Sequence, residues 1–253
     1  MKVEILRCLS DNFSYLVIDE KNRDACVIDP SESDTVIKFL ENKKINLKFI
    51  LNTHHHADHV GGNIELKNKY KAKVIGFIDD KNRIPGIDIC LKDKEIWRDQ
   101  DFEFKTFHIP GHTSGHICYH FFKEKFLFTG DTLFSLGCGR IFEGTYKHMF
   151  DSLNLIKSFP KETLIFCGHE YTKSNYNFCV TYDKENLYLK EKSKFIKLRL
   201  KNNLPTIPVK LSEEINCNIF LRCADKQIKR SLGLNDASEI EVFKKLRELK
   251  DAF

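Results

Sequence analysis

The sequence predicts an α+β protein in which a strand-rich part is followed by a helical part. Residues 1–169 contain short runs of β-forming residues separated by turns, with occasional helical stretches between them. Residues 170–253 instead carry apolar residues at helical spacing among many lysines. Strands interleaved with helices favour sheets whose outer faces are covered by helices. We therefore expect two domains, residues 1–169 and residues 170–253.

The charge of the chain divides at the same place. Residues 1–169 hold 24 basic and 24 acidic side chains, whereas residues 170–253 hold 17 basic and 12 acidic ones. The net charge of +5 therefore lies entirely in the last third of the chain. All ten histidines lie at or before position 169. This division indicates that the two parts have different roles.

The first part opens with β-type runs at 3–7, 14–18 and 25–28, which are bounded by Asp-Asn and Lys-Asn turns. Ser33 is then expected to cap a helix, because apolar residues follow it at helical spacing. A strand at 48–51 comes next, and two glycines precede a helical stretch that ends near Tyr70. The remaining strands of this part are expected at 73–77, 102–109, 117–122, 126–129 and 164–167, with a helix at 148–158.

The second part is expected to contain two amphipathic helices. Residues 186–200 form a basic helical pattern, and residues 238–249 place five apolar side chains on one side. Residues 204–208, Leu-Pro-Thr-Ile-Pro, form a break between them. The second part therefore predicts a helical domain.

Composition excludes several classes of protein. The chain is 42% hydrophobic and 30% charged, which is typical of a globular protein, and none of its apolar runs approaches the roughly 18 residues of a membrane span. The first residues lack the pattern of a signal peptide, so we expect a cytoplasmic protein without a membrane partner. Nine cysteines occur without a Cys-x-x-Cys pair, which favours buried thiols. A net charge of +5 is too small to indicate a nucleic-acid partner.

The strongest motif is Thr-His-His-His-Ala-Asp-His at residues 53–59, directly after an apolar strand. Residues two apart in an extended segment point the same way, so His54 and His56 can converge on one metal ion. Asp58 and His59 in the following turn can bind a second ion. Imidazole and carboxylate ligands suit zinc, iron or manganese.

Three further segments place a glycine directly before a polar residue at the end of a β-type run. They contain Gly111-His112, Gly130-Asp131 and Gly168-His169. Glycine permits a close approach of the backbone at such a place. Together with the first motif they provide seven ligands for two divalent ions. One ion is expected to bind His54, His56 and His112, the other Asp58, His59 and His169, with Asp131 bridging both.

Two such ions would provide a nucleophile at neutral pH, because a metal lowers the pKa of bound water from 15.7 to about 7. Asp58 and Asp131 would be the catalytic carboxylates, since they hold the ions that position the hydroxide. Zinc is the expected metal, with iron or manganese as alternatives.

These motifs resemble the metallo-β-lactamase superfamily, and more narrowly its glyoxalase II (hydroxyacylglutathione hydrolase) family. The narrower resemblance also rests on residues 137–140, 142–145 and 167–172, and it extends to Phe253. It implies a four-layer αββα sandwich followed by a C-terminal α-helical domain that binds glutathione. It further implies hydrolysis of S-D-lactoylglutathione to D-lactate and glutathione, in methylglyoxal detoxification. The bridging hydroxide would attack the thioester carbonyl of this small-molecule substrate.

The resemblance also implies where glutathione binds. Arg140 and Tyr171 match two of the family's substrate-binding positions, and Arg247 and Lys250 match a pair near the end of the chain. Asp29 matches a residue that orients a ligand imidazole. Phe142 departs from family members that have tyrosine there, which removes one hydrogen bond to the peptide. The resemblance also favours a monomer.

Other functions remain alternatives at this point. A persulfide dioxygenase shares the histidine-rich motif but uses one iron and lacks the basic helical tail. A nuclease of the same superfamily would be expected to carry a more basic tail. A non-catalytic metal-binding or redox-carrier protein is a different class, although redox relatives pair the site with a flavin domain. β-Lactam hydrolysis is disfavoured because no cysteine lies at a ligand position.

Overall fold

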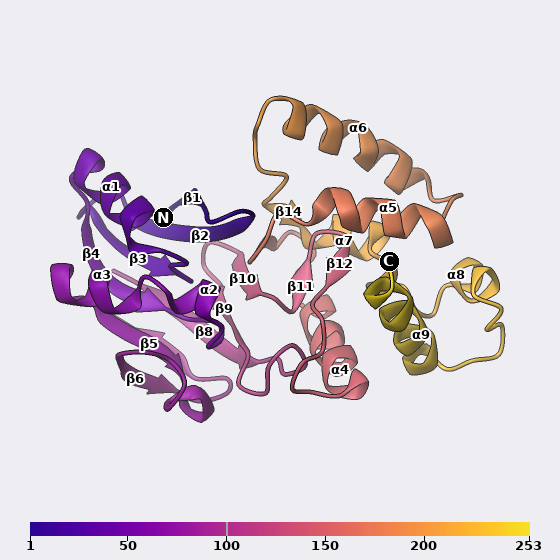
Figure 1. Ribbon diagram of the computed structural model, residues 1–253, viewed down its shortest axis with the longest axis horizontal. Helices are drawn as coiled ribbons and strands as arrows, with labels where there is room; N and C mark the ends of the chain where they lie inside the picture. The colour runs from indigo at the N-terminus through magenta and orange to yellow at the C-terminus, as the bar shows by residue number, and fades with distance from the viewer. Residues whose placement is uncertain (100) are drawn as a thin grey trace. The chain divides into compact units, whose positions relative to one another are not determined.

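The computed structural model describes residues 1–99 and 101–253, and these form two compact units (Figure 1). The first unit comprises Met1–His108 and Gly115–Gly130. The second comprises Ile109–Ser114 and Asp131–Phe253. No helix in the described residues is long and apolar enough to cross a membrane.

The first unit contains a six-stranded sheet with the strands in chain order. Its strands are β1 (Lys2–Cys8), β2 (Asn12–Asp19), β3 (Asp24–Ile28), β4 (Asn46–Leu51), β5 (Lys73–Phe77) and β6 (Ile87–Leu91). The pairs β1–β2 and β2–β3 are antiparallel, whereas β3 to β6 pair in parallel. Because parallel neighbours need a crossover, helices connect β3 to β4 and β4 to β5.

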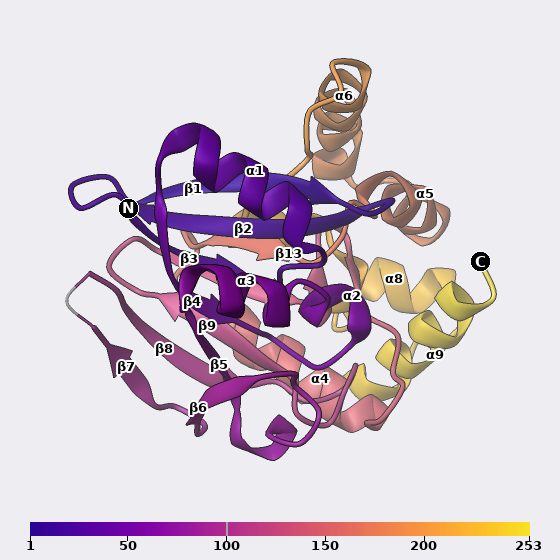
Figure 2. The ribbon, with the colours of Figure 1, turned by 60° about the vertical axis from the view of Figure 1, so that its left-hand side comes forward.

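Two of these helices, α1 (Ser33–Lys43) and α3 (Asn63–Tyr70), cover one face of this sheet (Figure 2). Val36, Leu40 and Leu66 of the helices pack with Leu16 and Val27 of the strands in one buried cluster. The expected Ser33 cap is wrong, because Glu32 is the capping residue and Ser33 is already helical. The Ser33 hydroxyl donates instead to the Glu65 carboxylate of α3.

The second sheet of this unit is an antiparallel meander. The strands of this sheet that belong to the first unit are β7 (Ile96–Arg98), β8 (Glu103–His108), β9 (Ile117–Phe121) and β10 (Phe126–Gly130). Its inner face packs on the first sheet through aromatic rings. Tyr15 and Phe128 have ring centroids 5.3 Å apart, and Phe49 meets Trp97 edge-on at 4.7 Å. The Tyr119 hydroxyl is buried and donates to the Asn52 carbonyl, which ties β9 to the end of β4.

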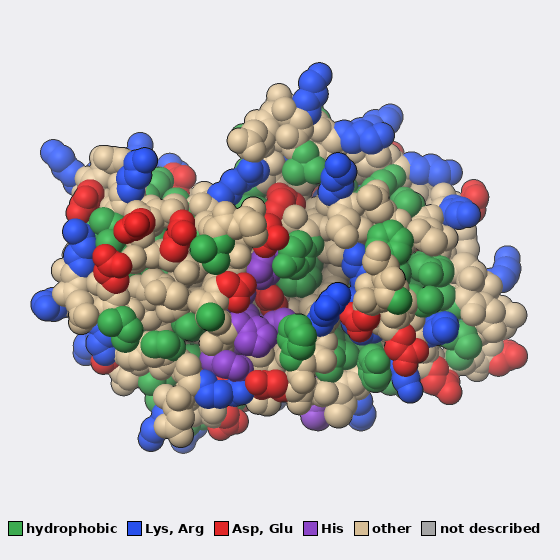
Figure 3. Space-filling view, viewed as in Figure 1, with side chains coloured by type: hydrophobic (Ala, Val, Ile, Leu, Met, Phe, Trp, Pro, Cys, Tyr) green, Lys and Arg blue, Asp and Glu red, His purple; other side chains and the backbone are tan. Residues whose placement is uncertain are grey.

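The second unit consists mainly of helices. They are α4 (Tyr146–Lys157), α5 (Thr172–Tyr182), α6 (Leu187–Lys201), α7 (Leu211–Cys217), α8 (Lys226–Ser231) and α9 (Glu239–Asp251), with a 3-10 turn at Ile219–Leu221. Two short ladders accompany them, β11 (Leu133–Phe134) with β12 (Gly137–Cys138) and β13 (Leu164–Cys167) with β14 (Val209–Lys210). Lys and Arg side chains gather over α6 (Figure 3), where Lys190, Lys194, Lys197 and Lys201 are exposed.

A buried carboxylate fixes the β11–β12 turn to the helices of this unit. Glu214 of α7 is fully buried, and it accepts hydrogen bonds from the Leu136 N–H, the Ser135 hydroxyl and the Asn218 amide. Burial raises the pKa of this carboxyl group. The three donors replace the water that the carboxyl group loses on burial. The turn that leads toward Arg140 is therefore held from one side.

Candidate metal centre

The histidine motif lies directly after β4, where the chain passes into the one-turn helix α2 (Ala57–Val60). The His54 and His56 ring centroids are 4.7 Å apart, and those of His54 and His59 are 4.2 Å apart. His55 is turned elsewhere, with Nδ1 3.2 Å from a carboxylate oxygen of Asp80. The alternation of an extended segment therefore separates His55 from its two neighbours.

Asp29 orients the buried part of this motif. Its carboxylate accepts hydrogen bonds from the N–H and the hydroxyl of Thr53, each at 2.7 Å, and lies 3.0 Å from Nδ1 of His59. Since the Thr53 hydroxyl donates to Asp29, its oxygen can accept the Nδ1 proton of His54, 3.0 Å away. This network leaves Nε2 of His54 and of His59 as the lone-pair nitrogens that can ligate a metal.

Ligand-type atoms of Asp29, His54 and His59 lie within 4.8 Å of one another. The Asp58 carboxylate is held by Asn12, whose amide donates to its Oδ2 at 2.9 Å and to its backbone carbonyl at 3.1 Å. Sequence reasoning missed Asn12, since it lies 46 residues from Asp58 at the start of β2.

The second unit brings three further predicted ligands together. Oδ2 of Asp131 lies 3.5 Å from Nε2 of His112 and 3.2 Å from Nε2 of His169. All three side chains are nearly buried. His112 and His169 were expected to bind different ions. A carboxylate that lies between their imidazoles is placed as the predicted bridge between the two ions would need. Nitrogen and oxygen donors of this kind fit zinc, iron or manganese.

The turn that carries Arg140 also orients His112. Nδ1 of His112 lies 2.9 Å from the Arg140 carbonyl, which fixes the imidazole with Nε2 toward Asp131. A Cβ at Gly139 would overlap the Asp131 carbonyl, so only glycine lets this turn come so close to Asp131. The predicted ligands His112 and Asp131 and the turn that carries Arg140 therefore form one local structure.

Aromatic side chains lie against two of the expected ligands. The Tyr171 ring stacks on the His169 imidazole with centroids 4.7 Å apart and 4° between the planes. Phe142 meets His112 edge-on at 5.2 Å and is 62% exposed. Both aromatic residues therefore present apolar surface beside imidazoles that the sequence predicts as metal ligands.

Arg247 and Lys250 occupy different environments on α9. Arg247 is 3% exposed, and its guanidinium donates to the Cys138 carbonyl at 2.7 Å and to Asp251 at 2.9 Å. The same Asp251 carboxylate lies 3.6 Å from Nε of Arg140. Lys250 is partly exposed and donates to the Ser174 hydroxyl at 3.1 Å. Burial, and then the positive charge of Arg247, lower the pKa of Lys250.

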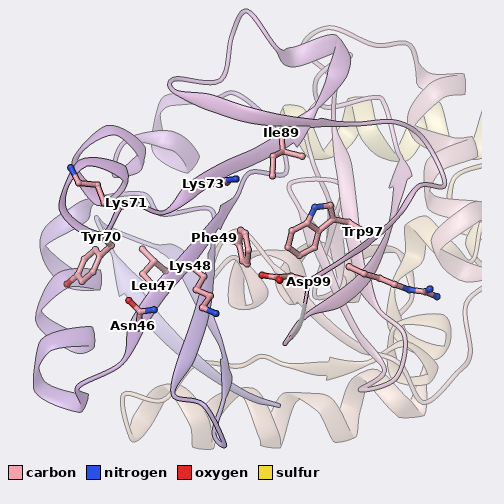
Figure 4. A pocket seen from close by; sticks show the side chains of 11 residues that line it. Asn46, Leu47, Lys48, Phe49, Tyr70, Lys71, Lys73, Ile89, Trp97 and Asp99 are labelled. Carbon is pink, nitrogen blue, oxygen red and sulfur yellow. The ribbon is translucent and has the colours of Figure 1, made fainter.

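A cavity of about 530 Å³ lies elsewhere in the first unit (Figure 4). It is lined by Asn46, Lys48 and Lys73 at the starts of β4 and β5, and by Trp97. The histidine motif follows the other end of β4. The cavity is therefore separate from the predicted metal ligands of this unit.

The sequence matches two family models that together span almost the whole chain. Residues 10–169 match the metallo-beta-lactamase superfamily, and residues 170–253 match the C-terminus of hydroxyacylglutathione hydrolase. Among curated relatives, hydroxyacylglutathione hydrolase of Pelagibacter ubique is 56% identical over 100% of both chains. The enzyme of that name from Methylococcus capsulatus is 42% identical over 99% of both chains.

Solved structures agree with this fold. ETHE1 from Myxococcus xanthus aligns with a TM-score of 0.70 and 23% identity, over 98% of this chain and 90% of its own. The BLEG-1 B3 metallo-beta-lactamase aligns with a TM-score of 0.68 and 20% identity, over 87% of this chain and 99% of its own. The predicted fold class, a metallo-β-lactamase fold with a helical C-terminal part, is confirmed. This fold and its His/Asp clusters indicate divalent metal binding. The chain belongs to the hydroxyacylglutathione hydrolase family of the metallo-β-lactamase superfamily.

Proposed function

We propose that the chain hydrolyses S-2-hydroxyacylglutathione thioesters, with S-D-lactoylglutathione as the substrate and D-lactate and glutathione as the products. The observation that carries this proposal is the Asp131 carboxylate, which lies within 3.5 Å of two imidazole nitrogens. The family of the chain agrees with it, since the relatives with high identity are named hydroxyacylglutathione hydrolases. The reaction would be the second step of methylglyoxal detoxification.

The proposed centre contains two divalent ions, with zinc as the preferred metal and iron or manganese as alternatives. The carboxylates of Asp58 and Asp131 offset part of their charge. When bound, the ions would lower the pKa of water and polarise a carbonyl group. The ligands we propose are those expected from the sequence, His54, His56 and His112 for one ion, Asp58, His59 and His169 for the other, and Asp131 for both.

A thioester suits a site without a dedicated general acid. The leaving thiol has a pKa of about 8.5, so it can depart as a thiolate without receiving a proton in the same step. The site therefore mainly has to position the acyl carbonyl and the attacking water. The fixed imidazoles of His59 and His112 would do so by holding the metal ions in place. Asp29 and the Arg140 carbonyl hold these imidazoles in their tautomers.

We propose that glutathione binds beside the Arg140 turn and α9. Arg140 and Lys250 would attract its carboxylates, and Tyr171 would contact its peptide. Arg247 would act at the same place, and its hydrogen bond to the Cys138 carbonyl also holds the turn. We further propose a cytoplasmic monomer that acts on this small molecule without a nucleic-acid or membrane partner. Size-exclusion chromatography with light scattering tests the monomer.

Substitution of Arg247 or Lys250 tests whether these residues bind the substrate or support the metal centre. We expect Lys250→Ala to raise KM for the glutathione thioester about tenfold, because one charge on the ligand loses its partner, with metal content unchanged. Arg247→Ala should raise KM at least as much and also lower the melting temperature, because it removes a buried hydrogen bond. Kinetics with metal analysis measure both. A fall in metal content at constant KM would show that these residues serve the metal centre instead.

The lowered pKa of Lys250 predicts how substrate binding depends on pH. Lys250 is charged below its pKa and neutral above it, so attraction for an anionic substrate is lost as the pH rises through a value below the ordinary 10.5. KM of the wild-type protein should therefore rise in alkaline buffer. Lys250→Arg, which stays charged, should give a flatter profile. Identical profiles for the two proteins would contradict a binding role for Lys250.

A substrate panel tests the proposed function against its rivals. Metal-loaded protein would be offered several glutathione thioesters, glutathione persulfide with oxygen uptake recorded, a β-lactam and a phosphodiester. We expect turnover of the thioesters, fastest for 2-hydroxyacyl groups. Oxygen consumption with the persulfide, or cleavage of the phosphodiester alone, would favour a dioxygenase or a nuclease of the same fold.

A further inference from the structure

The buried carboxylate of Asp80 belongs neither to the proposed ligand set nor to the proposed glutathione site. Asp80 ends the 3-10 turn Ile78–Asp80, which follows β5, and its side chain is fully buried. A buried carboxylate is costly unless its oxygens are paired and hydrogen-bonded. The groups that bind the Asp80 carboxylate therefore indicate its role in the structure.

Both oxygens of Asp80 have partners. Oδ2 lies 3.2 Å from Nδ1 of His55, and Oδ1 accepts a hydrogen bond from Nε of Arg83 at 3.0 Å. Nη1 of Arg83 also lies 3.5 Å from Nε2 of His55. Since an arginine can only donate, this contact assigns the proton of His55 to Nδ1, where it faces the carboxylate. Asp80 and Arg83 thus bind both nitrogens of the His55 ring.

The same carboxylate abuts a second segment of the first unit. A Cβ at Gly115 would overlap Oδ1 of Asp80, so the glycine backbone lies directly against the carboxylate. The next residue, His116, is buried and stacks on His54 with ring centroids 4.7 Å apart and 19° between the planes. Asp80 therefore contacts His55, which lies between the proposed ligands His54 and His56. It also contacts Gly115, which precedes His116, the ring that stacks on His54.

We propose that Asp80 is a positioning residue for the metal centre, acting through His55 and the Gly115 backbone on the orientation of His54 and His56. The inference rests on the proposed metal site. The His55 side chain points away from His54 and His56, and its contacts with Asp80 and Arg83 hold the loop that carries all three histidines. Any side chain at position 115 would overlap the Asp80 carboxylate and displace it from His55.

The alternative is that Asp80 only stabilises the fold through its ion pair with Arg83. The two roles differ in what they change. An ion pair that only stabilises the fold alters the free energy of unfolding and leaves the ligand geometry intact. A positioning residue alters metal affinity and the ligand field even in protein that is fully folded.

The test is a titration of metal-free protein with Co²⁺, recorded by visible absorption. We expect Asp80→Asn to bind Co²⁺ about tenfold more weakly than wild type and to change its absorption bands, in the range found for partners of ligand residues. The matched control is Asp88→Asn. Asp88 accepts hydrogen bonds from Lys67 and from the Val74 N–H in the same unit, away from the histidine motif, and its loss should leave affinity and spectrum unchanged.

His55→Gln keeps the proposal testable if Asp80→Asn fails to fold. It should weaken Co²⁺ binding to a similar extent, and the double variant should bind no more weakly than either single variant, because both act through one contact. Wild-type affinity and spectrum in folded Asp80→Asn, or an equal loss in Asp88→Asn, would overturn the proposal. If wild-type protein itself bound no Co²⁺, the proposed metal site would fail instead.

Discussion

Asp131→Ala should abolish metal binding at one of the two proposed positions and lower kcat/KM for the thioester by at least a hundredfold. The carboxylate lies between Nε2 of His112 and Nε2 of His169, so its removal leaves two imidazoles without the group that joins them. A hundredfold loss corresponds to about 2.7 kcal/mol of transition-state stabilisation. Metal content by elemental analysis and activity should fall together, because in our proposal one residue serves both.

A matched control for this variant is Asp183→Asn in the same unit. Asp183 is also buried and pairs with Arg222, so its replacement disturbs a buried ion pair without touching a proposed ligand. It should lower the melting temperature and leave metal content per folded molecule unchanged. Full metal content in Asp131→Ala, or an equal metal loss in Asp183→Asn, would contradict the ligand role of Asp131.

Asp29→Ala should destabilise the metal-free protein by roughly 3 kcal/mol, because three buried donors lose their acceptor at about 1 kcal/mol or more each. Those donors are the N–H and the hydroxyl of Thr53 and the Nδ1 of His59. Metal affinity should fall as well, by 10- to 100-fold, since the His59 tautomer is no longer fixed. Urea unfolding of the apoprotein and a metal titration measure the two effects separately.

Asp29→Asn separates the effect of losing the carboxylate charge from the effect of the backbone conformation at this position. Asp29 has a φ of 49°, in the left-handed region that asparagine tolerates better than alanine does. The asparagine variant should therefore recover part of the stability. It should not recover the metal affinity, because an amide oxygen is a weaker acceptor for the His59 proton than a carboxylate is. Equal metal affinity in wild type and both variants would show that Asp29 does not orient a ligand.

Local pattern was sufficient for much of the fold. The strands at Lys73–Phe77 and Leu164–Cys167 have the predicted bounds, because continuous apolar runs between turn residues specify buried strands directly. Helix α4 begins two residues earlier than expected, at Tyr146, because Thr145 and His148 form a capping box. The short helices α5, α7 and α8 were not predicted, since helices of one to three turns depend on tertiary packing more than on periodicity.

The candidate site was predictable where its residues lie in one segment or follow a strand with a glycine before them. The Thr53–His59 motif needs only the alternation of an extended chain to separate His55 from His54 and His56. Pairings such as Asp80 with His55, or Asn12 with Asp58, join segments 25 and 46 residues apart, and no sequence spacing specifies them. The burial of Arg247 could not be predicted from the sequence either. A helical pattern does not distinguish an exposed arginine from one that is buried and donates to a backbone carbonyl.

The charge division of the sequence also has a structural counterpart. Four lysines of the second part, Lys190, Lys194, Lys197 and Lys201, are exposed on α6, whereas Arg247 and Lys250 lie at least half-buried on α9. In our proposal the latter two bind the small anionic ligand, and the residues on α6 do not contact it. On this proposal, the net charge of +5 does not count the residues that contact substrate.

The most direct test of the proposed function is the release of free thiol from S-D-lactoylglutathione as metal is added back to metal-free protein. The account predicts negligible release by the apoprotein and a rate that rises with added zinc until about two ions are bound per chain. D-lactate should form in equal amount to the thiol. A metal-loaded protein that releases no thiol from this substrate would contradict the account.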